Sequence, residues 1–334
     1  MDPVTQGAIG AVLPQSVVKK SNLVFAGIFG FIAGMAPDLD VLIRSDTDPL
    51  LFLEYHRQFT HSLIFIPIGG LVCGVILYWL IGKWIGLTWK QSIFFCALGY
   101  GTHALLDACT SYGTMLFWPF SEERISWNII SIIDPIFTLP TLCLLVIAGV
   151  KKKKRYAQLA LAWTFLYISL GLIQRDNAIE MGKAIAKNRN HKFVRIEAKP
   201  SFANILVWKV IYETSEQFYI DAVRTGFFPR VFLGTSLPKL NVIRDFPRLN
   251  NVSQQFRDIE RFRWFSDDFL AKDPQNPDHI MDVRYSMIPN DITALWSIRI
   301  STAAPNSEHV EYITNRDQIS DRFKLLLKMI FGDG

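Results

Sequence analysis

The feature that most constrains this chain is a series of long, nearly uncharged apolar segments in its first half. A helix needs about 20 mostly apolar residues to cross a hydrocarbon core roughly 30 Å thick. Four segments have about this length: residues 62–82, 91–108, 129–150 and 156–174. A fifth segment, residues 21–37, is shorter but still long enough to be a candidate. Residues 4–18 are too few to span, and we expect a partly inserted helix there that Pro14 bends or ends. The sequence predicts an α-helical polytopic membrane domain.

The charged residues divide the chain into two parts. Residues 1–174 hold 12 Lys and Arg and 10 Asp and Glu, about 13% of that stretch, whereas residues 175–334 hold 23 and 20, about 27%. We predict a membrane domain over residues 1–175 and an extramembrane α+β domain over residues 176–334. Within the second domain, short alternating patterns indicate strands at 205–212, 218–223, 281–287 and 294–301, and helical patterns occur at 177–187 and 318–330.

Basic residues mark one side of the predicted membrane domain. Lys19 with Lys20, Lys83 with Lys90, and the run 151–155 lie at alternate ends of successive segments. Short cytoplasmic loops are enriched in Lys and Arg, so one orientation in a membrane accounts for all three clusters. That orientation predicts the C-terminal domain on the non-cytoplasmic side. The net charge of +5 is then an orientation signal, the lipid bilayer is the expected partner, and no nucleic-acid partner is expected.

Ionisable side chains are scarce in the apolar segments and gather at the predicted non-cytoplasmic ends of three of them. Such groups are costly at membrane depth unless they are paired or line a cavity. His103 and Asp107 are four residues apart and therefore share one face of a helix, and Gly99 would let another backbone approach that face closely. The full set comprises three histidines and three aspartates: Asp38, Asp40, His56, His61, His103 and Asp107.

This set of side chains suits a divalent cation. Imidazole and carboxylate together bind Zn²⁺, Mn²⁺ or Fe²⁺, and the lack of paired cysteines disfavours a closed structural zinc site. We expect one or two ions, with zinc preferred over manganese or iron. A bound ion lowers the pKa of its water to near neutrality, so hydrolysis is the predicted reaction class. Asp38 or Asp40 would act as general base, and Arg57 would bind a substrate anion.

Each element also fits a purely structural role when it is considered alone. The aspartates after Pro37 fit a turn, and His61 fits an interfacial residue in the first turn of a helix. His103 fits a buried histidine that is hydrogen-bonded to Asp107, and Arg57 fits an ordinary interfacial salt bridge. The convergence of all six candidate ligands on one side of the predicted membrane favours a metal or catalytic centre.

The same residues resemble, in order, the motifs of the YdjM-like family, bacterial and archaeal integral membrane proteins described as metal-dependent hydrolases. The resemblance covers about residues 1–150 and rests on PDLD at 37–40, HRQFTHS at 56–62 and GTHALLD at 101–107. It implies a membrane-bound metal-dependent hydrolase whose ligands are the six residues above. Many members have a histidine near the position of Gln6, so this residue departs from the pattern. We expect its amide oxygen to contribute to substrate binding.

A fainter similarity is to zinc-dependent phospholipase C and the single-strand-specific zinc nucleases, which also use a PD element and an HxxxD helix. That similarity implies a phosphoester substrate or a lipid-linked one. Fold-level analogy of this kind does not identify a particular substrate.

Two other classes of function fit the sequence. A membrane transporter or metal-handling protein would also carry His and Asp in its membrane segments, although residues 73–82 and 141–150 carry no charge to line a path. A non-catalytic interaction protein would use the metal to brace its helices. It would bind metal tightly without an open coordination position.

Overall fold

The computed structural model describes residues 1–315 and 319–332, whose contacts divide into two compact units. We call them the helical unit, which comprises Met1–Ile43, Tyr55–Leu172 and Phe202–Asn204, and the sheet unit, which comprises Arg44–Glu54, Ile173–Ser201 and Ile205–Gly334. The predicted fold class, a helical membrane region followed by an α+β domain, is confirmed. One loop from within the predicted membrane region, Arg44–Glu54, belongs to the sheet unit.

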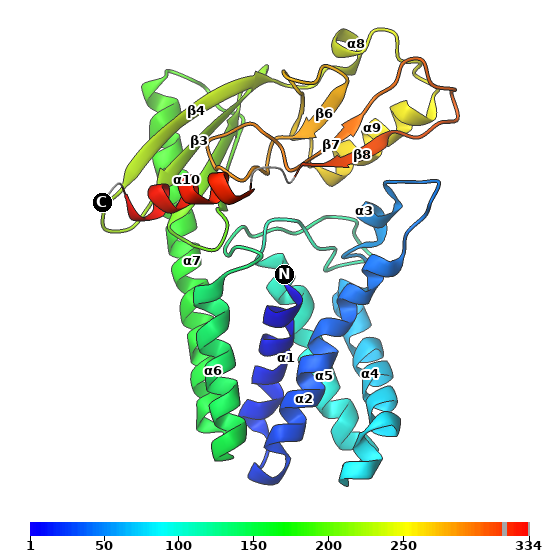
Figure 1. The fold of residues 1–334 in the computed structure, drawn as a ribbon, viewed down its shortest axis with the longest axis vertical. Coiled ribbons are helices and arrows are strands. Elements are labelled where there is room, and N and C mark those ends of the chain that lie inside the picture. The colour runs from blue at the N-terminus through cyan, green and yellow to red at the C-terminus, as the bar shows by residue number, and fades with distance from the viewer. Residues whose placement is uncertain (316–318, 333–334) are drawn as a thin grey trace. The chain divides into compact units, whose positions relative to one another are not determined.

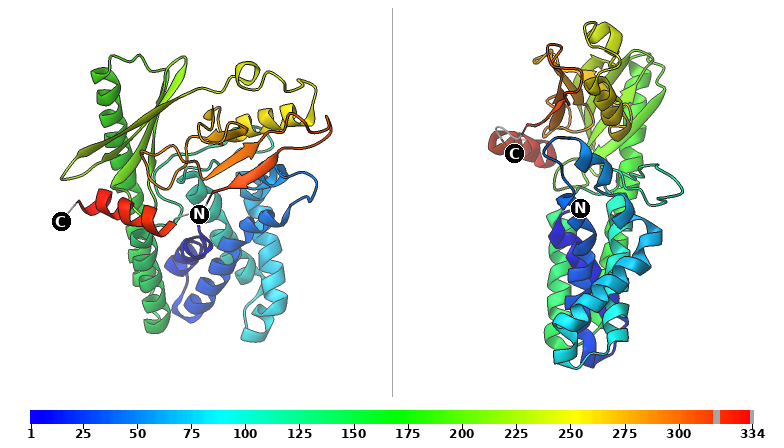
Figure 2. Two further views of the ribbon diagram at one scale, coloured as in Figure 1. Left: turned by 45° about the horizontal axis from the view of Figure 1, so that its top comes forward. Right: turned by 90° about the vertical axis from the view of Figure 1, so that its right-hand side faces the viewer.

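The helical unit is built from helices that run side by side (Figures 1 and 2). They are α1 (Pro3–Val17), α2 (Leu23–Met35), α4 (Ile66–Leu80), α5 (Trp89–Ala108), α6 (Pro135–Lys151) and the first part of α7 (Arg155–Asn188). Short 3₁₀ turns connect them: η1 (Lys20–Asn22), η2 (Ala36–Leu42), η3 (Phe59–His61), η4 (Leu63–Phe65) and η5 (Gly82–Ile85). In the bundle α1 packs against α2 and α5, and α5 packs against α2 and α4.

Glycines allow α1, α2 and α5 to approach closely. A Cβ atom on Gly99 of α5 would lie 2.3 Å from the Gly30 carbonyl oxygen of α2, and one on Gly10 of α1 would lie 2.5 Å from the same oxygen. Small residues at such crossings are typical of helix packing in membranes. The backbone approach expected at Gly99 is therefore present, and it brings the C-terminal half of α5 against the end of α2.

Within the described residues, three helical segments are long and apolar enough to cross a membrane: Lys20–Leu42, Leu63–Leu80 and Arg155–Asn188. Helix α6 is apolar but shorter, and α5 is long enough but less apolar because it carries buried polar residues such as Ser92, His103 and Asp107. The exposed faces of the helices are apolar; Val72, Ile76 and Leu80 of α4 are examples. Exposed apolar faces of this kind suit contact with lipid.

Two predicted membrane segments have different bounds in the structure. Helix α6 begins at Pro135 and not at residue 129, because the Asp134 side chain caps it by accepting hydrogen bonds from the N–H groups of Ile136 (3.1 Å) and Phe137 (3.3 Å). Helix α7 continues through the predicted membrane segment 156–174 and the predicted helix 177–187 as one element. No proline interrupts residues 155–188, so nothing in that stretch ends the helix.

The sheet unit contains, within the described residues, two four-stranded antiparallel sheets whose strands follow chain order. The first holds β1 (Arg195–Pro200), β2 (Val207–Glu213), β3 (Gln217–Arg224) and β4 (Arg230–Pro238), and the second holds β5 (Leu270–Lys272), β6 (His279–Asp282), β7 (Trp296–Arg299) and β8 (Glu311–Thr314). Its short helices are α3 (Leu51–Tyr55), which ends one residue into the helical unit, α8 (Val242–Asp245), α9 (Gln254–Phe265) and α10 (Ile319–Phe331). The four strand patterns predicted from sequence overlap β2, β3, β6 and β7. Residue 318, where the last helix was predicted to begin, lies outside the described residues.

The loop Arg44–Glu54 packs into the core of the sheet unit. Its Leu50 and Leu53 are buried against a cluster that includes Phe262 and Phe265 of α9. The Arg261 guanidinium of the same helix contacts the Asp48 carboxylate (2.8 Å) and the Glu54 carboxylate (2.5 Å). The chain therefore leaves the helical unit shortly after Asp40, is anchored in the sheet unit, and returns just before His56.

Candidate metal centre

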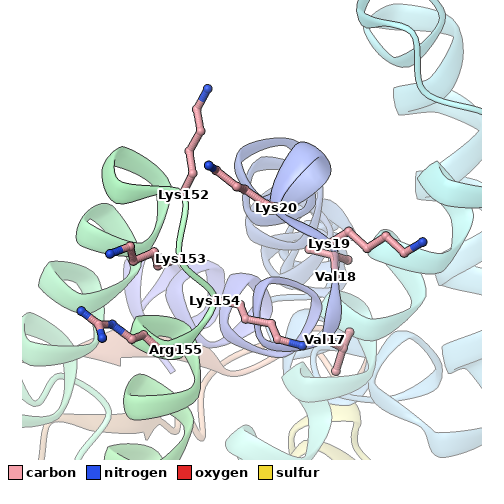
Figure 3. A pocket seen from close by; sticks show the side chains of 8 residues that line it. All are labelled: Val17, Val18, Lys19, Lys20, Lys152, Lys153, Lys154 and Arg155. Atoms are coloured by element: carbon pink, nitrogen blue, oxygen red, sulfur yellow. The ribbon is translucent and has the colours of Figure 1, made fainter.

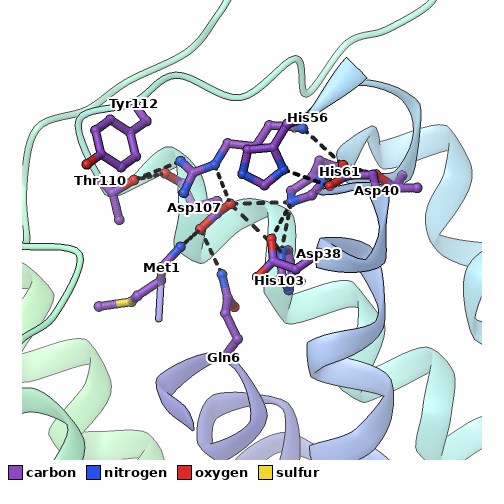
Figure 4. Close-up of polar contacts among 12 residues, drawn as sticks. Met1, Gln6, Asp38, Asp40, His56, His61, His103, Asp107, Thr110 and Tyr112 are labelled. Carbon is purple, nitrogen blue, oxygen red and sulfur yellow. Dashed lines mark hydrogen bonds and ion pairs between the residues drawn. The ribbon is translucent and has the colours of Figure 1, made fainter. Parts of the chain in front are cut away.

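Three segments of the helical unit bring all six predicted ligands together (Figure 4). The 3₁₀ turn η2 at the end of α2 carries Asp38 and Asp40, the segment around η3 carries His56 and His61, and the last turns of α5 carry His103 and Asp107. His61, His103 and Asp107 are fully buried, whereas the Asp38 side chain is 19% exposed.

Four of these side chains form one group whose ligand atoms face a common point. His61 Nε2 and His103 Nε2 are 2.9 Å apart, and each lies 3.4 Å from Asp38 Oδ1. Asp107 Oδ2 lies 3.4 Å from His61 Nε2 and 3.8 Å from His103 Nε2. A tetrahedral zinc site with bonds of about 2.0–2.2 Å has ligand atoms about 3.3–3.6 Å apart. Three of the five separations lie in this range and the other two are 2.9 and 3.8 Å, so the spacing of this group is close to that around a tetrahedral metal ion.

Polar contacts on the far side of each imidazole fix its orientation, so that its Nε2 atom faces the group. His103 Nδ1 is 2.6 Å from the Gly34 carbonyl oxygen, which can only accept, so this nitrogen carries the proton. His61 Nδ1 lies 2.9 Å from Thr60 Oγ1 and 3.2 Å from Asp40 Oδ2, and the Thr60 hydroxyl itself donates to Asp40. With the proton on Nδ1, each neutral imidazole would present its Nε2 lone pair to the group, an arrangement that a bound cation would stabilise.

A second group shares Asp38 with the first. Asp38, Asp40 and His56 also offer ligand atoms within 4.8 Å of one another. Asp40 accepts hydrogen bonds from the Arg57 N–H (3.0 Å) and the Thr60 hydroxyl (2.7 Å), and its Oδ1 is 2.7 Å from His56 Nδ1. Burial lowers the pKa of His56 although Asp40 opposes this shift, so the imidazole is neutral near pH 7. Asp38 belongs to both groups and would contribute to either ion if both sites were filled.

The amino-acid sequence of the helical unit matches a known family. Residues 1–178 match the YdjM inner membrane protein family. The chain belongs to this family. It is 33% identical to the inner membrane protein YbcI of Escherichia coli over 128 residues, which are 37% of this chain and 69% of that protein. It is 23% identical to the uncharacterized protein YfhP of Bacillus subtilis over 278 residues, 78% of this chain and 80% of that protein. No solved structure matches.

The YdjM match and the YfhP match cover different lengths. All six candidate ligands lie within residues 1–178, the range of the family match. The alignment with YfhP covers 78% of the chain and so includes residues of the sheet unit beyond position 178. The candidate metal centre therefore belongs to the part shared across the YdjM family.

Arg57 and Gln6, both predicted to bind substrate, contact Asp107 in this YdjM-family chain. Arg57 Nε lies 3.1 Å from Asp107 Oδ2, and Gln6 Nε2 donates to Asp107 Oδ1 at 2.8 Å. The Met1 amino group also pairs with Asp107. Despite the nearby Arg57, Asp107 Oδ2 accepts no hydrogen bond of good geometry from any residue that the structure describes. Gln6 uses its N–H and not the amide oxygen expected from sequence.

The structure also adds contacts that sequence reasoning missed. The Arg57 guanidinium donates to Thr110 Oγ1 (3.2 Å) and lies 5.3 Å from the Tyr112 ring centroid. Arg57 has a φ of +68°, a conformation that is uncommon for a residue with a side chain. Thr60 orients two ligands, since its hydroxyl contacts Asp40 and His61. It lies inside the HRQFTHS motif next to His61, and this position could have indicated its role from sequence.

Proposed function

We propose that this chain is a membrane-bound metal-dependent hydrolase. His61, His103 and Asp107 would hold one divalent cation with Asp38 or a water at its fourth position, and Asp40 with His56 and Asp38 would form a second site. The observation that carries the proposal is the near-tetrahedral spacing of the first four ligand atoms, 2.9–3.8 Å for the separations given above. Two imidazoles and two carboxylates favour zinc, with manganese or iron as alternatives.

The residues around the site suit hydrolysis. When bound, a divalent cation lowers the pKa of a coordinated water and so supplies a hydroxide nucleophile near neutral pH. Asp38 is the more exposed carboxylate of the first group and, when it is not bound to the ion, would accept the proton of the attacking water. Asp40 holds His61 and His56 in position through its hydrogen bonds, and Arg57 supplies positive charge for an anionic group on the substrate.

The substrate class we propose is a phosphoester, on a lipid headgroup or on another lipid-linked molecule. An anionic phosphoryl group is complementary to Arg57, and the apolar helices of the unit keep the site close to a bilayer. The basic turns at the other end of the helical unit favour an orientation with the site on the non-cytoplasmic side of the inner membrane.

The direct test uses the purified full-length protein in detergent. We expect elemental analysis to find one or two divalent ions per chain, and we expect hydrolysis of bis(p-nitrophenyl) phosphate or of a short-chain phospholipid. His103→Ala should lower metal affinity by more than about 100-fold, because even a residue that only orients a ligand changes it 10–100-fold. His279→Ala, in the sheet unit, is the matched control and should retain both metal and activity. Metal-free, fully active wild-type protein would contradict the proposal.

A structural metal site is the second candidate, because three of the four ligands in the first group are fully buried. It differs in one measurable respect from a catalytic site. A bracing ion would bind tightly, and His103→Ala would lose metal and thermal stability, but neither phosphoester would be hydrolysed. The same experiment therefore separates the two functions.

A further inference from the structure

Two turns of the helical unit form a basic pocket at the end away from the metal centre (Figure 3). Helix α1 begins beside Asp107, which Gln6 contacts, and ends at Val17 in this pocket. The cavity measures about 470 Å³. It is lined by the α1–α2 turn and the α6–α7 turn, which contribute Val17, Val18, Lys19, Lys20, Lys152, Lys153, Lys154 and Arg155. Six cationic side chains from segments about 130 residues apart thus surround one cavity.

The positive charge of this pocket is uncompensated. Residues 3–37 and 135–174, which include both turns, contain no Asp or Glu. None of the six cationic side chains has an acidic partner in the part of the chain that the structure describes, and all six are exposed. The sheet unit differs, since Arg189, Arg261 and Arg284 each pair with a carboxylate. Mutual repulsion among the six cations makes an anionic ligand favourable.

Apolar surface continues from the pocket along the helices. Val17 is 53% exposed, and Val146 and Val150, on the last turns of α6, are 63% and 77% exposed. Arg155 donates a hydrogen bond to the Tyr156 hydroxyl at 3.0 Å. Tyrosine is common at the level of lipid headgroups. A ligand with an anionic head and apolar chains would match both surfaces, whereas a nucleic acid would leave the apolar surface uncovered.

We propose that the α1–α2 and α6–α7 turns form a binding site for the phosphate of an anionic phospholipid. The ammonium groups of Lys20 and Lys152, which extend from neighbouring turns in Figure 3, contact the headgroup, and the acyl chains lie along exposed α6. Basic pockets between membrane helices bind anionic headgroups in this way. The inference is independent of the hydrolase proposal, because it uses no residue of the metal centre.

The test compares lipids and variants on the purified full-length protein in a neutral detergent. Binding of short-chain phosphatidylglycerol, short-chain phosphatidylcholine and inorganic phosphate is followed by native mass spectrometry and by thermal shift. We expect phosphatidylglycerol to bind at least about tenfold more tightly than phosphatidylcholine, a difference that six cationic groups readily supply. The double variant Lys152→Gln with Lys153→Gln should lose most of this preference.

The matched control is Lys83→Gln with Lys90→Gln, which removes two positive charges from the α4–α5 turn at the same end of the helical unit. Retained lipid preference in this control supports a specific site. Equal loss in both double variants would mean that charge acts diffusely and would overturn the proposal. Binding of inorganic phosphate as tight as that of the lipid would also overturn it, because the acyl chains would then contribute nothing. Unchanged thermal stability of both variants in the absence of lipid checks that each is folded.

Discussion

The two units handle buried charge in opposite ways. In the sheet unit, the buried Asp282 carboxylate contacts the Arg284 guanidinium at 2.7 Å, and Asp221 accepts two hydrogen bonds from Arg189 at 2.6 and 2.9 Å. In the helical unit, the Nε2 atoms of His61 and His103 instead lie 2.9 Å apart and 3.4–3.8 Å from the Asp38 and Asp107 carboxylates. Each buried carboxylate named for the sheet unit thus has one dedicated cation. In the helical unit Asp107 already contacts Arg57 and the Met1 amino group, and the group that it forms with Asp38 and the two imidazoles could also receive a metal ion.

This difference separates a structural ion pair from a candidate binding site. A buried ion pair stabilises a fold only when both partners are present, and it requires nothing from solution. A group of converging acceptors is costly until a cation enters it. The comparison therefore predicts that the helical unit depends on metal and that the sheet unit does not.

The largest expected effect is that of metal removal on the helical unit. A cation present at about 1,000 times its dissociation constant stabilises the state that binds it by about 4 kcal/mol. Dialysis against a chelator should therefore speed amide hydrogen exchange in η2, η3 and the last turns of α5. Exchange in β2 and β3 should stay the same, and restoring zinc should reverse the change. Equal acceleration of exchange in both units would contradict this prediction, because the sheet unit would then also depend on the ion.

The second prediction concerns the sheet unit, where a buried carboxylate loses its cationic partner. Arg284→Met leaves Asp282 buried without its cation and should lower the free energy of unfolding by about 3 kcal/mol. Adding Asp282→Asn should recover much of this loss, since no charge then remains unpaired. Chemical denaturation measures the stabilities, and metal content, which should be unchanged in both variants, is the control. Loss of metal in Arg284→Met would show that metal binding in the helical unit depends on the stability of the sheet unit.

Sequence patterns predicted much of the fold because membrane helices and paired basic turns leave strong local signals. Length and apolarity located α2, α4 and α7, and alternation located β2 and β3. The strand pattern missed β1 and β8, and it also missed β4, most of whose residues are exposed, and the three-residue β5. Helix α1 was expected to be partly inserted. In the structure Gln6 to Val12 are buried between neighbouring helices, because glycines allow these helices to approach closely. The apolar length of the segment does not reveal this packing.

The ligands of the candidate site could be predicted for a different reason. An ionisable residue among apolar segments is rare, so Asp38, His61 and His103 were conspicuous without any knowledge of their partners. The orienting contacts could not be predicted in the same way. The bond of His103 to the Gly34 carbonyl and that of Gln6 to Asp107 depend on residues 69 and 101 positions apart being brought together. No local pattern encodes such contacts.

The smallest expected effect comes from the hydrogen bonds that orient the candidate ligands, and it is measured as a change in metal affinity. Thr60→Val removes the hydroxyl that donates to Asp40 and lies beside His61 Nδ1, while it keeps the shape of the side chain. We expect metal affinity to fall 10–100-fold, about 1.4–2.7 kcal/mol, as is usual when an orienting partner is lost. Thr164→Val is the matched control, because Thr164 is buried in α7 and bonds only the Ala160 carbonyl among the contacts described. Competition with a zinc-binding dye measures both affinities. An equal fall in the two variants would assign the effect to helix packing, whereas a fall in Thr60→Val alone would show that Asp40 and Thr60 fix the direction of the His61 lone pair.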